Sequence, residues 1–108
     1  MKNVSIPIFQ TTLRIYKSDE REKFQRRFGS IPDEWYGCQT GEGIYVGENK
    51  HQNAIGTCYH EAIHFVDWLI EDRLGVELEG LEGNTELRAY MVQYVGDKIR
   101  EYCVEELG

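Results

Sequence analysis

Two of the three histidines in this chain of 108 residues lie four residues apart, in the stretch TCYHEAIHFVDW. On a helix, residues with this spacing stand one turn above each other, so His60 and His64 can each direct a ring nitrogen at one Zn²⁺ ion. Glu61 lies beside this face, where its carboxylate can take a proton from a zinc-bound water. The pattern H-E-x-x-H therefore predicts a zinc-dependent hydrolytic site, with Glu61 as the general base.

A catalytic zinc site normally has three protein ligands and leaves the fourth position for water. The candidates for the third ligand are Glu86, Asp67, Glu71, Glu82 and His51. Ligands taken from one straight helix form a row, whereas zinc needs donors that converge from different directions. We therefore favour Glu86, which lies in the first turn of a second predicted helix, after a loop long enough to reverse the chain. The alternative is that Glu86 is a carboxylate that interacts favourably with the dipole at a helix N-terminus.

Three other residues near the motif each have two interpretations. Asp67 can accept the free N–H of His64 or hold a neighbouring side chain, and the alternative is a solvated carboxylate. Tyr90, one turn after Glu86, is a candidate catalytic residue whose hydroxyl would face the oxyanion of a tetrahedral intermediate. Packing of Tyr90 in the core is the interpretation that we favour over this role. His51, in the polar stretch ENKHQN, is most simply an exposed loop residue.

The motif helix follows a region that is rich in strand-forming residues. Residues 4 to 16 predict a first strand, in which Pro7 makes the start an edge or an irregular segment. The stretch EWYGCQTGEGIYVGE predicts a hairpin that turns at Gly41, Glu42 and Gly43. A short helix is expected between them, with Asp19 and Glu22 forming a capping box.

Two long helices are predicted in the second half of the chain. Apolar residues recur at helical spacing from Ala54 to Leu74, and Gly75 is expected to end this helix. A glycine-rich acidic loop, GVELEGLEGN, precedes a second helix from Thr85 to about Glu106. The element order predicts a single α+β domain over residues 1–108, with the H-E-x-x-H motif on the first long helix.

Composition excludes several classes of function. A net charge of −7 argues against binding to nucleic-acid backbones, and the one basic cluster is interspersed with acidic residues and predicts a solvated helix face. No segment approaches the length of apolar chain that a membrane span needs, and the N-terminus does not resemble a signal peptide. Three cysteines without a C-x-x-C pair favour free, buried thiols in a reducing compartment, so we expect a cytoplasmic protein. Its oligomeric state is not predicted.

The residues His60, Glu61, His64 and Glu86 together resemble the gluzincin branch of the zincin metallopeptidases. The resemblance covers roughly residues 44 to 100 and implies a zincin-like fold, one zinc ion and a peptide or protein substrate. It also implies a small mixed or antiparallel sheet whose edge strand, here matched by residues 44–46, pairs with the substrate. The chain departs from the family in having Tyr90 where many members have an aspartate. It is more weakly similar to small proteins assigned as metallopeptidases in phage and bacterial genomes.

Two hypotheses compete with a peptidase. One is a zinc-stabilised protein-interaction module without hydrolytic activity. It is suggested by the length of the chain, which leaves few residues to form the sides of a substrate cleft. A fourth protein ligand would favour this module, since a closed coordination sphere leaves no place for water. The other is a helical protein whose histidines bind nothing.

Overall fold

The structure, a computed structural model, describes residues 1–6, 10–47, 52–74 and 85–104. Its elements are, in chain order, β1 (Lys2–Ile6), β2 (Thr11–Tyr16), the 3-10 helix η2 (Ser18–Glu20), α1 (Arg21–Phe28), β3 (Gly37–Thr40), β4 (Gly43–Val46), α2 (Gln52–Leu74) and α3 (Thr85–Cys103). The predicted α+β class and both long helices are confirmed. Their predicted ends at Gly75 and Glu106 lie outside the described residues. No helix among the described residues is long and apolar enough to cross a membrane.

The four strands form one mixed sheet in the order β1-β2-β4-β3. The predicted hairpin is confirmed as the antiparallel pair of β3 and β4. The prediction that residues 44–46 form an edge strand is wrong, because β4 lies between β3 and β2, with which it pairs in parallel. All four β4 residues are buried, as expected for a strand covered on both faces, and β3 is an edge strand instead.

The predicted first strand is in fact two antiparallel strands. β1 and β2 pair with Val4 opposite Leu13, and Gln10, just before β2, has a positive φ of 51°. The predicted capping box between Asp19 and Glu22 is also not the one observed. Glu20 accepts the hydrogen bond from the Lys17 N–H at 3.1 Å, because a 3-10 turn precedes the α-helix.

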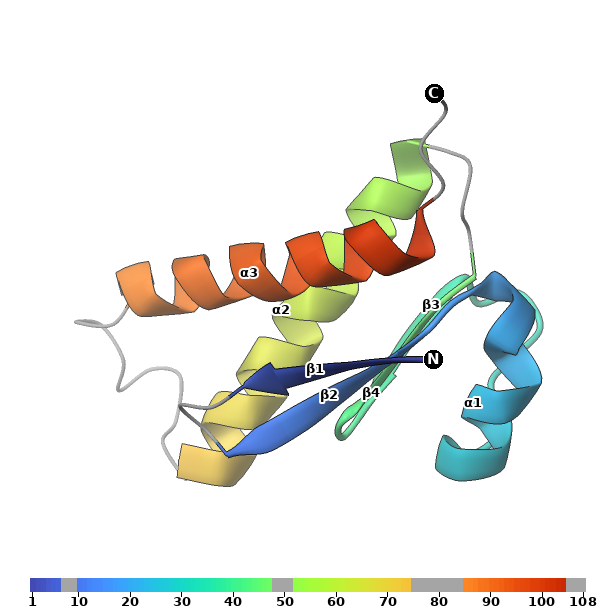
Figure 1. Ribbon diagram of the computed structural model, residues 1–108, viewed down its shortest axis with the longest axis horizontal. Coiled ribbons are helices and arrows are strands. Elements are labelled where there is room, and N and C mark those ends of the chain that lie inside the picture. The colour runs from blue at the N-terminus through green and yellow to red at the C-terminus, as the bar shows by residue number, and fades with distance from the viewer. Residues whose placement is uncertain (7–9, 48–51, 75–84, 105–108) are drawn as a thin grey trace.

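Helices cover both faces of the sheet. Figure 1 shows α2 and α3 crossing each other on one side of the strands, with α1 on the other side. The larger apolar cluster joins β1, β2 and β4 to the buried faces of α2 and α3, including Leu13, Ile44, Phe65 and Val95. A smaller cluster around Phe24 lies under α1. The three cysteines are buried and free, as predicted.

The crossing of α2 and α3 depends on a glycine. A Cβ atom at Gly96 would lie 2.2 Å from the Tyr59 ring, whose hydroxyl donates a hydrogen bond to Asp97. Although alanine has the higher helix propensity, by about 1 kcal/mol, we expect Gly96→Ala to lower the free energy of unfolding by about 1–3 kcal/mol, because the helices must separate. Urea denaturation measures this change.

Gly56 of α2 is the matched control. No atom lies within 4 Å of a Cβ built there, so Gly56→Ala is expected to stabilise the protein by about 0.5–1 kcal/mol. Equal effects of the two substitutions would contradict a close contact at the crossing.

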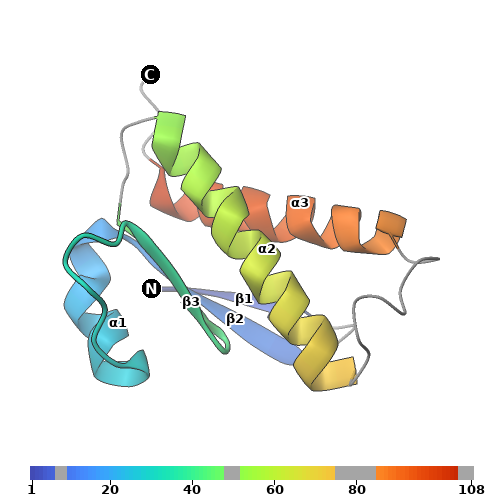
Figure 2. The same cartoon turned by 180° about the vertical axis from the view of Figure 1, so that it is seen from behind.

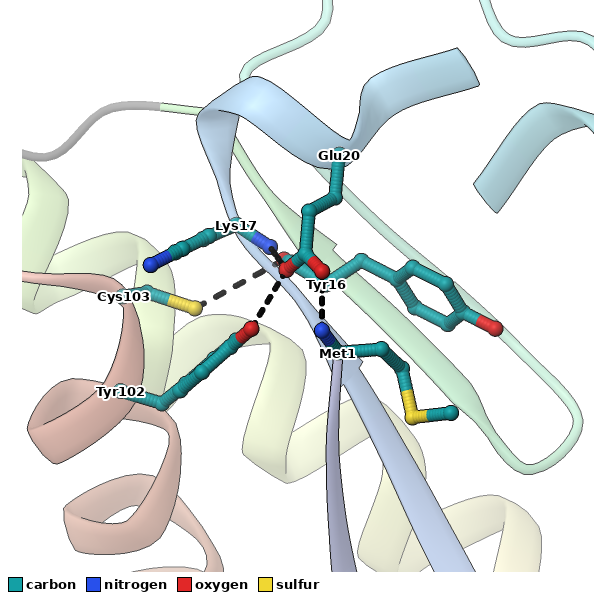
Figure 3. Close-up of polar contacts among 6 residues, drawn as sticks. All are labelled: Met1, Tyr16, Lys17, Glu20, Tyr102 and Cys103. Atoms are coloured by element: carbon teal, nitrogen blue, oxygen red, sulfur yellow. Dashed lines mark hydrogen bonds and ion pairs between the residues drawn. The ribbon is translucent and has the colours of Figure 1, made fainter. Parts of the chain in front are cut away.

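Glu20 joins the two ends of the described chain. Figure 3 shows its carboxylate, which is buried, accepting hydrogen bonds from the Met1 amino group, the Tyr102 hydroxyl at 2.7 Å and the Lys17 N–H. Burial by itself raises the pKa of Glu20, but these hydrogen bonds outweigh burial and lower the pKa below its usual value.

A group whose pKa is lowered by folding stabilises the protein above its unfolded pKa and loses this contribution as the pH falls through its folded pKa. We therefore expect Glu20→Gln to lower the free energy of unfolding by about 1–3 kcal/mol at pH 7, and by less under acidic conditions. Urea denaturation at pH 7 and at an acidic pH measures the loss of stability, and Glu22→Gln, which changes an exposed carboxylate, is the control. A loss that does not depend on pH would contradict it.

Candidate metal and catalytic site

The three motif residues lie in the middle of α2. His60 and His64 are exposed on one side of the helix, whereas Glu61 is buried, with 6% of its surface exposed. Successive helical residues are about 100° apart, so Glu61 is turned from the histidine side toward the sheet. The helix forms here because an apolar stripe that includes Cys58, Ala62 and Phe65 packs in the core.

The imidazole rings of the two histidines lie against each other. Their Nε2 atoms lie 3.1 Å apart, and the ring planes are inclined by 80°. Two imidazoles on one tetrahedral zinc ion, each at about 2.0–2.1 Å, would have nitrogens about 3.3 Å apart. Two unprotonated nitrogens this close repel each other unless a proton or a cation lies between them. The separation suits an N–H···N hydrogen bond between the two rings, and the donor types also suit a zinc ion.

Glu61 is held against the sheet rather than in solvent. Burial raises the pKa of its carboxyl, and the nearby His60 and His64 oppose this shift only in part. A Cβ atom at Gly37 of β3 would lie 2.9 Å from Glu61 Oε2 and 2.6 Å from Thr57 Cγ2. A carboxyl with a raised pKa beside two imidazoles has the properties of a general base and acid.

Strand β3 runs beside this part of α2 and is an edge of the sheet (Figure 2). The Gly47 N–H donates to the Tyr36 carbonyl at 2.7 Å, which identifies residues 36 and 47 as a hydrogen-bonded pair of the ladder. Because the pairs of an antiparallel ladder alternate, the backbone N–H and C=O of Gly37 and Gln39 point away from β4. The strand that borders Glu61 thus presents its backbone groups to a further strand.

Among the described residues, the structure brings no third potential metal ligand to the two histidines. Glu86 is exposed in the first turn of α3, and the described ranges contain no group of three His, Cys, Asp or Glu side chains placed to hold a metal ion. Among the alternatives, Glu71 is exposed, and Glu82 and His51 lie outside the described residues.

Asp67 is hydrogen-bonded to Arg88 and not to His64. Both of its carboxylate oxygens accept hydrogen bonds from Arg88 of α3, at 2.8 and 3.1 Å. Of the predicted roles, the structure supports the one in which Asp67 holds a neighbouring side chain. Tyr90 has 68% of its surface exposed, so the prediction that it packs in the core is wrong. Its role toward an oxyanion remains a prediction.

Sequence reasoning missed two residues that shape the site. Gly37 leaves the space that Glu61 occupies, and Arg88 joins α3 to α2 one turn beyond His64. Neither has a local sequence signal, because each acts through a segment that is distant in the chain.

No protein-family model matches the chain, and neither a curated relative nor a similar solved structure was found.

Proposed function

We propose that this protein is a zinc-dependent hydrolase with a zincin-like fold, in which His60 and His64 bind the metal, and that its substrate is an extended peptide. The observation that carries this proposal is the pair of Nε2 atoms 3.1 Å apart beside the buried carboxyl of Glu61. When bound, zinc supplies Lewis acidity, which polarises a carbonyl group and lowers the pKa of a water molecule.

The residues of the chain then have separate tasks. Glu61 takes the proton of the attacking water and passes it to the leaving amine, for which a carboxyl with a raised pKa is suited. The outward N–H and C=O groups of Gly37 and Gln39 hold the peptide as an added strand. Its backbone then lies beside Gly37, where a Cβ atom would touch Glu61.

We propose Glu86 as the third ligand. The Arg88–Asp67 ion pair, two residues away, already joins the start of α3 to α2. Completion of the ligand set requires the first turn of α3 to approach the histidines, and metal binding can supply the free energy for such ordering. A solvent-exposed carboxylate is free to make this approach.

The ligand assignment predicts a specific loss of affinity. Glu86→Ala is expected to weaken zinc binding by about 10²-fold or more, whereas Glu71→Ala, which removes an exposed carboxylate of α2, is expected to leave it within about twofold. Competition with a chelator of known affinity measures both. Equal losses in the two variants would contradict Glu86 as the ligand.

The function itself is tested with the purified protein and a library of denatured proteins. We expect about one zinc ion per chain and cleavage that is lost on chelation, restored by zinc and absent in Glu61→Gln. A protein that binds zinc but shows no Glu61-dependent cleavage would instead be the zinc-stabilised interaction module.

A further inference from the structure

Two large aromatic side chains lie exposed immediately before β3. Trp35 and Tyr36 have 49% and 61% of their surface exposed, and they end a run of exposed residues that begins at Pro32. We call residues 32–36 the aromatic segment. Single exposed apolar residues are common, but adjacent exposed aromatics beside a candidate site are typical of a recognition surface.

The aromatic segment is held in place from α1. The Arg21 guanidinium donates hydrogen bonds to the carbonyls of Pro32 at 2.8 Å and Trp35 at 3.3 Å, and to that of Ile31 at 3.2 Å. The same guanidinium lies over the Tyr45 ring, 5.4 Å from its centroid. One side chain therefore fixes three carbonyls, so that little backbone entropy would be lost when a partner binds.

The aromatic segment is continuous with the candidate site. Gly37, the next residue, is the one at which a Cβ atom would contact Glu61. Trp35 is two residues earlier, and because the chain bends at Tyr36 its Cα lies within about 7 Å of that of Gly37. A peptide that pairs with Gly37 and Gln39 and continues past the start of β3 would therefore come close to the aromatic segment within about two residues of the bond beside Glu61.

The chemistry of the aromatic segment indicates what it would accept. Indole and phenol rings offer large apolar faces to an apolar or aromatic side chain. Asp33 and Glu34 are exposed in the same segment, and the chain carries a net charge of −7, so an acidic side chain would be repelled.

We propose that the aromatic segment is a specificity-determining subsite, which selects extended peptides with a large apolar side chain within two residues of the cleaved bond. This inference rests on the proposed function, because it takes the substrate to lie along β3. It adds the substrate class to that function. Arg21 is a positioning residue, and Trp35 and Tyr36 make the contacts.

The test reads binding separately from cleavage. The chain has two tryptophans, so Trp68→Phe leaves Trp35 as the fluorescent reporter. The protein used is the double variant Glu61→Gln, Trp68→Phe, whose fold is checked by circular dichroism. Its binding is measured to three short peptides that differ only at one position, which is Phe, Ser or Glu. We expect the Phe peptide to shift the Trp35 emission to shorter wavelength and to bind about tenfold more tightly than the Ser peptide, with the Glu peptide weakest.

Variants then locate the effect. Anisotropy of labelled peptides follows binding where Trp35 is absent, and Trp35→Ala is expected to abolish the preference for Phe. Tyr94→Ala, which truncates an aromatic residue of similar exposure (47%) on α3, is expected to keep the preference. Equal binding of the Phe and Ser peptides, or an equal loss in the Tyr94 variant, would overturn the proposal.

The same experiment separates the two proposals. If the Phe preference depends on Trp35 but the wild-type protein shows no Glu61-dependent cleavage, the subsite is supported and the hydrolytic function fails. If Glu61-dependent cleavage occurs with the same preferences in wild type and Trp35→Ala, the function is supported and the subsite fails.

Discussion

Replacing Glu61 by glutamine is expected to lower kcat by about 10²–10⁴-fold while the zinc content of the protein stays unchanged. The amide is nearly the same size as the carboxyl but cannot take a proton from water. Because the histidines hold the metal in our proposal, the loss falls on kcat rather than on zinc affinity. Steady-state kinetics on a cleaved peptide, together with the measured zinc content, separate these effects.

The same substitution is expected to raise the melting temperature of the zinc-free protein. Burial raises the pKa of Glu61, which means that folding opposes its ionised form at neutral pH. A neutral amide removes this opposition, so activity and stability are expected to change in opposite directions. Asp72→Asn, which neutralises an exposed carboxylate of the same helix, is the control and is expected to alter neither property. A Glu61→Gln protein that melts lower than wild type would show that the carboxyl has a stabilising partner.

Replacing Gly37 by alanine is expected to lower the cleavage rate by about 10²-fold and the free energy of unfolding by about 1–3 kcal/mol. The added Cβ atom would lie 2.6 Å from Thr57 Cγ2 and 2.9 Å from Glu61 Oε2, closer than such atoms can approach. Both the Thr57 methyl group and the Glu61 carboxylate must therefore shift, and displacement of the carboxylate lowers the rate. Kinetics and urea denaturation report the two losses separately.

Thr57→Ser provides the matched rescue. It removes the Cγ2 atom that the new methyl group meets first, and it keeps the hydroxyl. In the double variant of Gly37→Ala and Thr57→Ser we expect much of the stability to return, while the rate stays low, because the contact with Glu61 remains. Full recovery of both would show that Gly37 matters only for the packing of β3 on α2.

The motif could be predicted because it is local. Backbone hydrogen bonds four residues apart dictate that His60 and His64 share a helix face, whatever the helix packs against. The strands were harder to predict. The stretch GIYV has no polar alternation, and this pattern is typical of a strand covered on both faces, yet the resemblance to gluzincins implied an edge. The parallel pairing of β4 with β2 depends on the crossover through α1, for which the sequence carries no direct signal.

From its amino-acid order alone, this chain predicts two long helices and a pair of histidines one helical turn apart with an adjacent carboxylate. Folding adds the neighbours of that pair: β3 rather than β4 as the bordering edge, the empty side-chain position at Gly37 that admits Glu61, and the link from Asp67 to Arg88. The division has one physical cause. Helical spacing follows from hydrogen bonds within a few residues, whereas strand order and helix crossings follow from how segments far apart in the chain bury their apolar faces together.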